Sequence, residues 1–118
     1  MNRFRGKGLV MFVERKEIKA RNAEPDASGN WIVEARVALE KSDTHVDLKL
    51  WENDQRPKVY DILKSLKKGD VVEFRGQVSA HAWITNGRAV GRVVCKPVFV
   101  TVVGHEQLEE DEDWGGDE

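Results

Sequence analysis

The spacing of apolar residues changes near the middle of this chain, and that change restricts the folds open to it. In residues 31–40 and 44–51, apolar side chains recur at every second position, which is typical of half-buried β-strands. In residues 56–70 they recur at helical spacing, with Pro57 suited to a first helical turn and Gly69 to a C-terminal cap. Period-two alternation returns directly afterwards. We therefore expect a mainly β protein with one short helix.

The N-terminal part of the chain predicts a long first strand. Residues 4–19 alternate in part, and Gly6 and Gly8 would permit a bend or bulge within that strand. The polar segment 20–30 contains Pro25 and predicts a loop between the first and second strands.

The C-terminal part predicts a hairpin and a long last strand. Residues 71–78 form the fourth strand of the pattern, and Asn86–Gly87 is a typical two-residue hairpin turn. In the strand that follows, we expect Gly91 at a bulge and Pro97 at an edge or break, because proline cannot donate to a β-ladder.

The predicted order of elements is three strands, one helix and two strands, which is the order of the OB-fold. That fold is a five-stranded Greek-key barrel whose open face, around the second and third strands, binds oligonucleotides or oligosaccharides. We therefore expect an all-β OB-fold barrel with its short helix between strands three and four. A different small barrel, or a mixed sheet with one helix, has the same order.

Strand alternation also assigns the core. Trp31 shares a strand face with Val33, and Phe74 shares one with Val72, so both aromatic residues are expected in the core. The single cysteine, Cys95, lies in an apolar stretch and is expected to be a small core residue, which excludes an internal disulfide. The parity of Phe12 is left open by the two glycines before it.

Charge divides the chain into two parts. Residues 1–104 contain all 19 Lys and Arg against 13 Asp and Glu, a net charge of +6, whereas residues 105–118 carry eight acids and no Lys or Arg, a net charge of −8. We expect a folded domain at 1–104 and a disordered acidic tail at 105–118, because the tail repels itself and buries little apolar surface. A basic body suits a polyanionic ligand, although such charges also serve solubility.

The sequence gives little support for an enzyme or for a bound cofactor. His45, His81 and His105 have neither metal-ligand spacing nor a nucleophile beside them, and Asp43 and Asp47 are expected to be solvated strand or loop residues. No metal site and no cofactor are expected. The chain has no long apolar run, and its start lacks the apolar core of a secretory signal, so we expect a cytoplasmic protein with no membrane contact.

Three segments carry a family resemblance: "LKKGDVVEFRGQV" (66–78), "WITNGRAVGRVV" (83–94) and the tail "EEDEDWGGDE". With them the chain resembles the OB-fold single-stranded DNA-binding proteins of bacteria and their phages. The resemblance implies a bacterial or phage-infected cell, and binding that protects unwound DNA during replication, recombination or repair. Family tails commonly end on an apolar residue that inserts into a partner enzyme, whereas here Trp114 stands four residues before an acidic end.

Single-strand binding without sequence choice needs cations along the phosphates and aromatic side chains on which bases stack. Trp51 falls on the polar side of its strand and Trp83 falls near the hairpin tip, where the family's stacking aromatics commonly lie; capping of the barrel ends is the structural alternative. The cations expected to contact nucleic acid are Arg5, Lys7, Arg36, Lys49, Arg75, Arg88 and Arg92. The tail residues expected to contact a partner or to modulate binding are Asp111, Glu112, Asp113, Trp114, Asp117 and Glu118.

Two functions follow as hypotheses. The first is sequence-independent binding of single-stranded DNA, with RNA as a further ligand, by a protein that contacts replication or recombination proteins through its tail and forms a homodimer. The alternative is an OB-fold adaptor or inhibitor of a replication or restart complex, in which the acidic tail is the active element.

Overall fold

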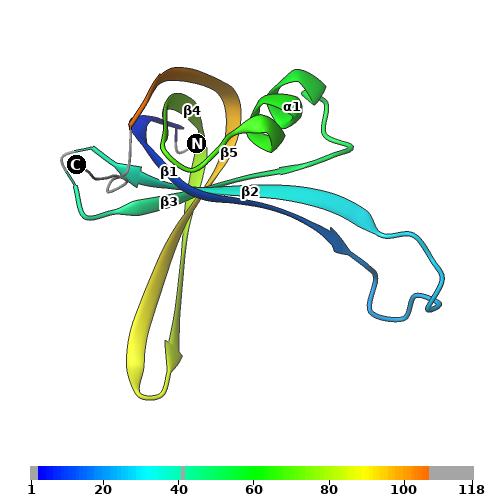
Figure 1. The fold of residues 1–118 in the computed structure, drawn as a ribbon. Helices are drawn as coiled ribbons and strands as arrows, with labels where there is room; N and C mark the ends of the chain where they lie inside the picture. Colours follow the sequence, from blue (N-terminus) through cyan, green and yellow to red (C-terminus); the bar gives the residue numbers. More distant parts are fainter. Residues whose placement is uncertain (1–2, 41, 107–118) are drawn as a thin grey trace, which may run out of the picture.

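The computed structural model describes residues 3–40 and 42–106, and describes Trp83 through its backbone alone. Within these residues the chain forms a closed barrel with strand order β1-β2-β3-β5-β4 (Figure 1). The elements are β1 (Arg3–Ile18), β2 (Asn30–Leu39), β3 (His45–Trp51), α1 (Pro57–Ser65), β4 (Asp70–Thr85) and β5 (Arg88–His105). The predicted fold class and element order, including the helix between β3 and β4, are confirmed.

The barrel closes because β1 pairs with two different strands along its length. Its first part pairs with β4 and its second part pairs with β2, with Gly8 opposite both Val72 and Leu39. A Cβ atom on Gly8 would lie 2.2 Å from the carbonyl oxygen of Ala38, so only glycine permits this close crossing. The register with β2 then shifts at Met11, so the strand has a bulge, but beyond the two glycines at which a bend or bulge was expected.

The core is built from the inward residues of the strands and from one side of α1. Phe74 is 1% exposed and Cys95 is fully buried, as predicted, while α1 adds Tyr60 and Leu63. The core assignment of Trp31 is wrong: its ring is half-buried outside the core cluster and lies 4.1 Å from the Arg15 guanidinium. Trp31 stands near the start of β2, where the barrel interior ends, so an arginine covers it in place of core side chains.

Two glycine predictions concerned chain reversals. At the hairpin turn, Asn86 and Gly87 have φ angles of 52° and 74°, as a two-residue turn requires. The capping prediction for Gly69 is wrong, because α1 ends at Ser65 with Leu66 as its C-cap. Gly69, with φ of 98°, instead turns the chain into β4 and donates its N–H to the carbonyl oxygen of Val10.

The bulges of β5 lie elsewhere than expected. Gly91 pairs regularly with Ala82, so the bulge predicted there is wrong. The register shifts instead leave Val98 and Val103 without partners on β4, where the strand bends around the barrel. β5 is not broken at Pro97, which pairs with Gly76 of β4, but Pro97 does lie at an edge, as the alternative prediction had it, because pairing of β5 with β3 ends two residues earlier, at Cys95.

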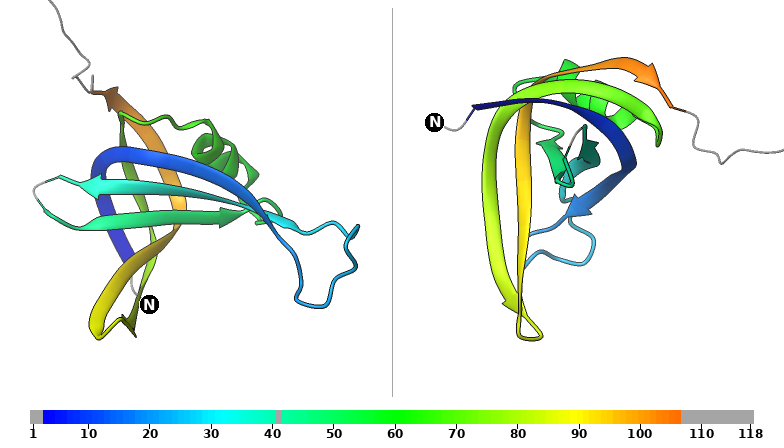
Figure 2. Two further views of the ribbon diagram at one scale, coloured as in Figure 1. Left: turned by 60° about the horizontal axis from the view of Figure 1, so that its bottom comes forward. Right: turned by 90° about the vertical axis from the view of Figure 1, so that its left-hand side faces the viewer.

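Two hairpins extend from the barrel. The β4–β5 hairpin continues past the end of the barrel as a two-stranded ribbon, and the β1–β2 connection projects in a different direction (Figures 1 and 2). Pairing of β5 with β3 begins at Val93. The ribbon therefore comprises Arg88 to Arg92 of β5, the Asn86–Gly87 turn, and His81 to Thr85 of β4, which pair with those β5 residues. The surface between the two projections is the outer wall of β2 and β3.

Candidate nucleic-acid interface

The outer wall of the barrel gathers charged and aromatic side chains from four strands. In the antiparallel register of β2 and β3, Arg36 lies opposite Asp47 and Glu34 lies opposite Lys49. Alternate residues of each strand therefore share the outward side. We call this surface the β2–β3 face, and its charged and aromatic side chains include Phe12, Glu14, Lys16, Glu34, Arg36, Asp47, Lys49, Trp51 and Arg92.

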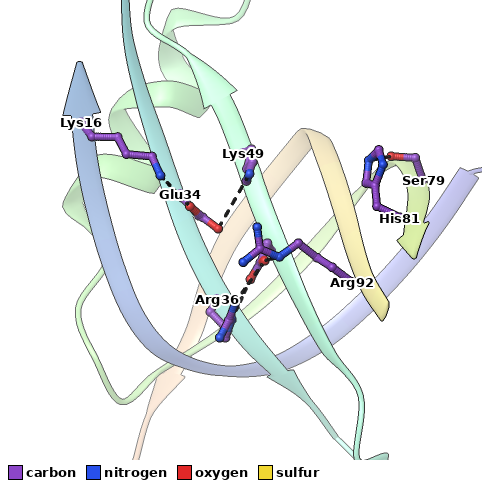
Figure 3. Close-up of polar contacts among 8 residues, drawn as sticks. Lys16, Glu34, Arg36, Lys49, Ser79, His81 and Arg92 are labelled. Atoms are coloured by element: carbon purple, nitrogen blue, oxygen red, sulfur yellow. Dashed lines mark hydrogen bonds and ion pairs between the residues drawn. The ribbon is translucent and has the colours of Figure 1, made fainter. Parts of the chain in front are cut away.

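Asp47 is the centre of a two-arginine cluster on this face. Its side chain is only 3% exposed, and its Oδ1 accepts a 2.8 Å hydrogen bond from Arg36 Nε while its Oδ2 lies 3.0 Å from Arg92 Nε (Figure 3). The hydrogen bond that Arg36 donates to Asp47 is the main reason that the pKa of Arg36 is raised above its ordinary value. The carboxylate thus holds two arginines from different strands in fixed positions.

Glu34 performs the same role for two lysines with looser geometry. Its carboxylate lies 3.8 Å from Lys16 Nζ and 4.0 Å from Lys49 Nζ, and its side chain is 6% exposed (Figure 3). Together with the Asp47 cluster, four cations surround two buried carboxylates. The two clusters carry a net charge of +2, and their cations are 28% to 46% exposed, so they remain accessible to an anionic ligand.

Sequence reasoning missed the buried state of these carboxylates. Asp43 is exposed as expected, but the prediction that Asp47 is solvated is wrong, because neighbouring strands bring Arg36 and Arg92 over it. The signal was the presence of opposite charges at outward positions of adjacent strands. Only the strand register, however, decides which pairs meet.

Two aromatic side chains lie exposed on the face. Trp51 ends β3 with 38% exposure, on the polar side that alternation predicted. Phe12, whose parity was open, is also 38% exposed, because the bulge at Met11 turns it outward; the Arg36 guanidinium lies 5.1 Å from its ring centroid. Aromatic rings beside cations are the combination on which unpaired bases stack.

The ribbon carries the remaining predicted residues of this region. His81 lies opposite Arg92 and is exposed, with its Nε2 3.4 Å from Ser79 Oγ (Figure 3). Arg88 lies at the exposed tip of the hairpin, and Trp83 is opposite Val90 in the ribbon. His81 was not among the predicted ligand-binding residues.

The predicted cations of β1 and β4 lie on a second surface, away from the centre of the β2–β3 face. Arg5 lies opposite Arg75, and the Arg75 guanidinium lies 5.3 Å from the ring centroid of Phe99. Lys7 follows on the same strand and lies 3.8 Å from Glu40. The nine predicted residues are therefore not brought together at one place, because β1 closes the barrel away from the β2–β3 face.

Other predictions concern the tail, metals and the cysteine. The residues Asp111, Glu112, Asp113, Trp114, Asp117 and Glu118 lie outside the described residues. Across residues 3–40 and 42–106, no three His, Cys, Asp or Glu side chains gather as metal ligands. In that same part of the chain no helix has both the length and the apolar character needed to cross a bilayer. Burial raises the pKa of the Cys95 thiol to about 11.

Comparison with solved structures identifies the fold. The small single-stranded DNA-binding protein of Streptomyces coelicolor matches with a TM-score of 0.57 at 17% identity, over 90% of this chain and 96% of that one. The Plasmodium falciparum SSB, solved in complex with ssDNA, matches with a TM-score of 0.49 at 17% identity, over 87% and 93% of the two chains. No protein-family model matches the sequence, and no curated protein does. The first likeness confirms, at the level of fold, the resemblance noted from the sequence.

Proposed function

We propose that this protein binds single-stranded DNA without sequence choice through the β2–β3 face. The observation that carries this proposal is the juxtaposition, on one exposed sheet surface, of four cations and two exposed aromatic rings. Cations following the phosphates supply the affinity, and stacking on Trp51 and Phe12 accepts any base because every base has a π-face. The likeness of the barrel to a small single-stranded DNA-binding protein supports this reading.

The buried carboxylates give the face a specific mode of action. Arg36 donates hydrogen bonds to Asp47 through Nε and Nη2, so its other guanidinium nitrogen, Nη1, can donate to a phosphate. Asp47 orders the two arginines before binding, which reduces the side-chain entropy that binding costs, and its negative charge at the same time opposes an incoming phosphate. In a cell, such binding would protect unwound strands during replication, recombination or repair.

A titration distinguishes this function from its alternatives. Oligo-dT should quench the tryptophan fluorescence of the full chain, and gel shifts with single-stranded DNA, double-stranded DNA and RNA should show preference for the single strands. The affinity should fall steeply with salt, by about 0.7 logarithmic units per neutralised phosphate for each tenfold rise in salt. Failure to bind any single strand, with or without residues 106–118, would reject this function in favour of the tail-dependent adaptor.

The acidic tail is proposed to compete with DNA for the basic surfaces of the body. This proposal rests on the charges of +6 and −8 in one chain, since tethering gives the tail a high effective concentration. Deleting residues 106–118 should tighten DNA binding, most strongly at low salt, where attraction is least screened. Trp114→Ala separates stacking from charge, and unchanged or weaker binding after truncation would contradict the competition.

A further inference from the structure

A concave surface lies beyond the β2–β3 face and carries an excess of positive charge. It is an open groove of about 840 Å³, and among the described residues that line it there are five cations and no carboxylate. We call it the basic groove; its lining includes Arg3, Phe4, Arg5, Arg56, Arg75, Lys96 and Val98. The groove lies where β1, β4 and β5 meet the residue that precedes α1.

The cations of the basic groove differ from those of the face in their partners. On the face, each cation is held by Glu34 or Asp47. In the groove, Arg56 and Lys96 share Asp54, at 3.7 and 3.2 Å, whereas Arg3, Arg5 and Arg75 form no ion pair within residues 3–40 and 42–106. Three arginines without a carboxylate partner among the described residues, beside two cations that share one, favour an anionic ligand from outside the fold.

The groove is continuous with the face through the strand register. Lys49 and Lys96 directly follow Leu48 and Cys95, the last residues that pair β3 with β5. Lys96 in turn lies opposite Gln77 of β4, and Gln77 lies opposite Arg3 of β1. The path from Lys96 to Arg3 therefore crosses two strand spacings, or about 10 Å at ~4.8 Å each.

We propose that a single-stranded polynucleotide bound on the β2–β3 face continues over Lys96 into the basic groove, which holds its backbone phosphates. This inference rests on the proposed function and adds a second contact region to it. The chemistry suits a polynucleotide because successive phosphates repeat along one chain, and the cations likewise succeed one another across β3, β5, β4 and β1. Val98, which lines the groove and is 40% exposed, offers apolar surface for bases beside those phosphates.

The test compares the full chain with Arg5→Gln/Arg75→Gln and with a charge-matched control, Lys67→Gln/Lys68→Gln, whose lysines are exposed at the other end of α1 from the groove. Each is titrated with oligo-dT of about 5 and about 16 nucleotides, the span of site sizes of OB-folds. The groove variant should bind the short strand like the control. On the long strand, the slope of the logarithm of the binding constant against the logarithm of salt should be shallower by about 1.4, because two phosphates contribute about 0.7 each. Between about 50 and 200 mM salt, the groove variant should therefore lose about sevenfold less affinity than the control.

Each remaining outcome overturns the proposal. Equal behaviour of the groove variant and the control on the long strand removes the groove from the binding path, while binding by the native chain leaves the proposed function standing. If the groove variant has a different mass in solution but binds oligo-dT with the same affinity per protomer, the groove is an interface between copies of this chain. Arg5→Gln alone, which breaks no ion pair among the described residues, repeats the test if circular dichroism shows the double variant unfolded.

Discussion

Replacing Asp47 with asparagine should lower the stability of the barrel and raise its affinity for single-stranded DNA. The carboxylate makes contacts of 2.8 and 3.0 Å with Arg36 and Arg92, and asparagine keeps its shape while removing its charge. Hydrogen bonds to charged groups contribute about 1.5–3 kcal/mol each when buried. The two arginines are 34% and 39% exposed, so water can replace part of these hydrogen bonds. We therefore expect the free energy of unfolding to fall by about 2 kcal/mol in total.

The gain in binding has an electrostatic origin. Removing Asp47 raises the net charge of the two clusters from +2 to +3. A phosphate about 7 Å from the lost charge, in a medium close to water, gains about 0.6 kcal/mol, or about threefold in affinity. The gain should shrink as salt rises, since screening acts on exposed charges.

The assay combines urea unfolding with oligo-dT titration at low salt. Asp61→Asn is the matched control, because Asp61 is 71% exposed on α1 and its loss changes the net charge equally. If both variants bind more tightly by the same factor, net charge alone explains the effect. If Asp47→Asn binds more weakly while folded, the carboxylate holds the arginines in their binding positions, and the reasoning that it opposes the phosphates is refuted.

Three further predictions follow from single residues. Trp51→Ala should weaken binding of oligo-dT by about 1–3 kcal/mol in a fluorescence titration, with an unchanged circular dichroism spectrum; unfolding of the variant would make the ring a structural cap. Cys95, with a pKa near 11, should react with a thiol reagent at pH 8 only after denaturant unfolds the barrel. For Asp70, burial alone would raise the pKa, but the N–H of Lys67 and the His105 ring lower it overall. The ionised Asp70 therefore stabilises the fold above pH ~4, and this contribution is lost as pH falls through the lowered pKa. In Asp70→Asn, the free energy of unfolding should depend less on pH below that value. An acid transition identical to that of the native chain would contradict this.

Local patterns in the sequence determined the elements and their order. Alternation in residues 31–40 and 44–51, helical spacing after Pro57 and the Asn86–Gly87 turn each depend on neighbouring residues, and each predicted element is present. The same alternation placed Phe74 in the core and Trp51 outside it, because strand parity fixes the side of each residue.

Tertiary structure decided which side chains meet. Burial of Asp47 between Arg36 and Arg92 requires the register of three strands, and the bulge at Met11 that turns Phe12 outward arises where β1 changes partners. The closure of β1 onto β4 likewise moved Arg5 and Arg75 away from the β2–β3 face and into a second surface. Pairing between strands distant in sequence leaves no local periodicity that a sequence pattern could reveal. Charge composition therefore predicted a basic body, and only the closed barrel showed that its cations are divided between two surfaces.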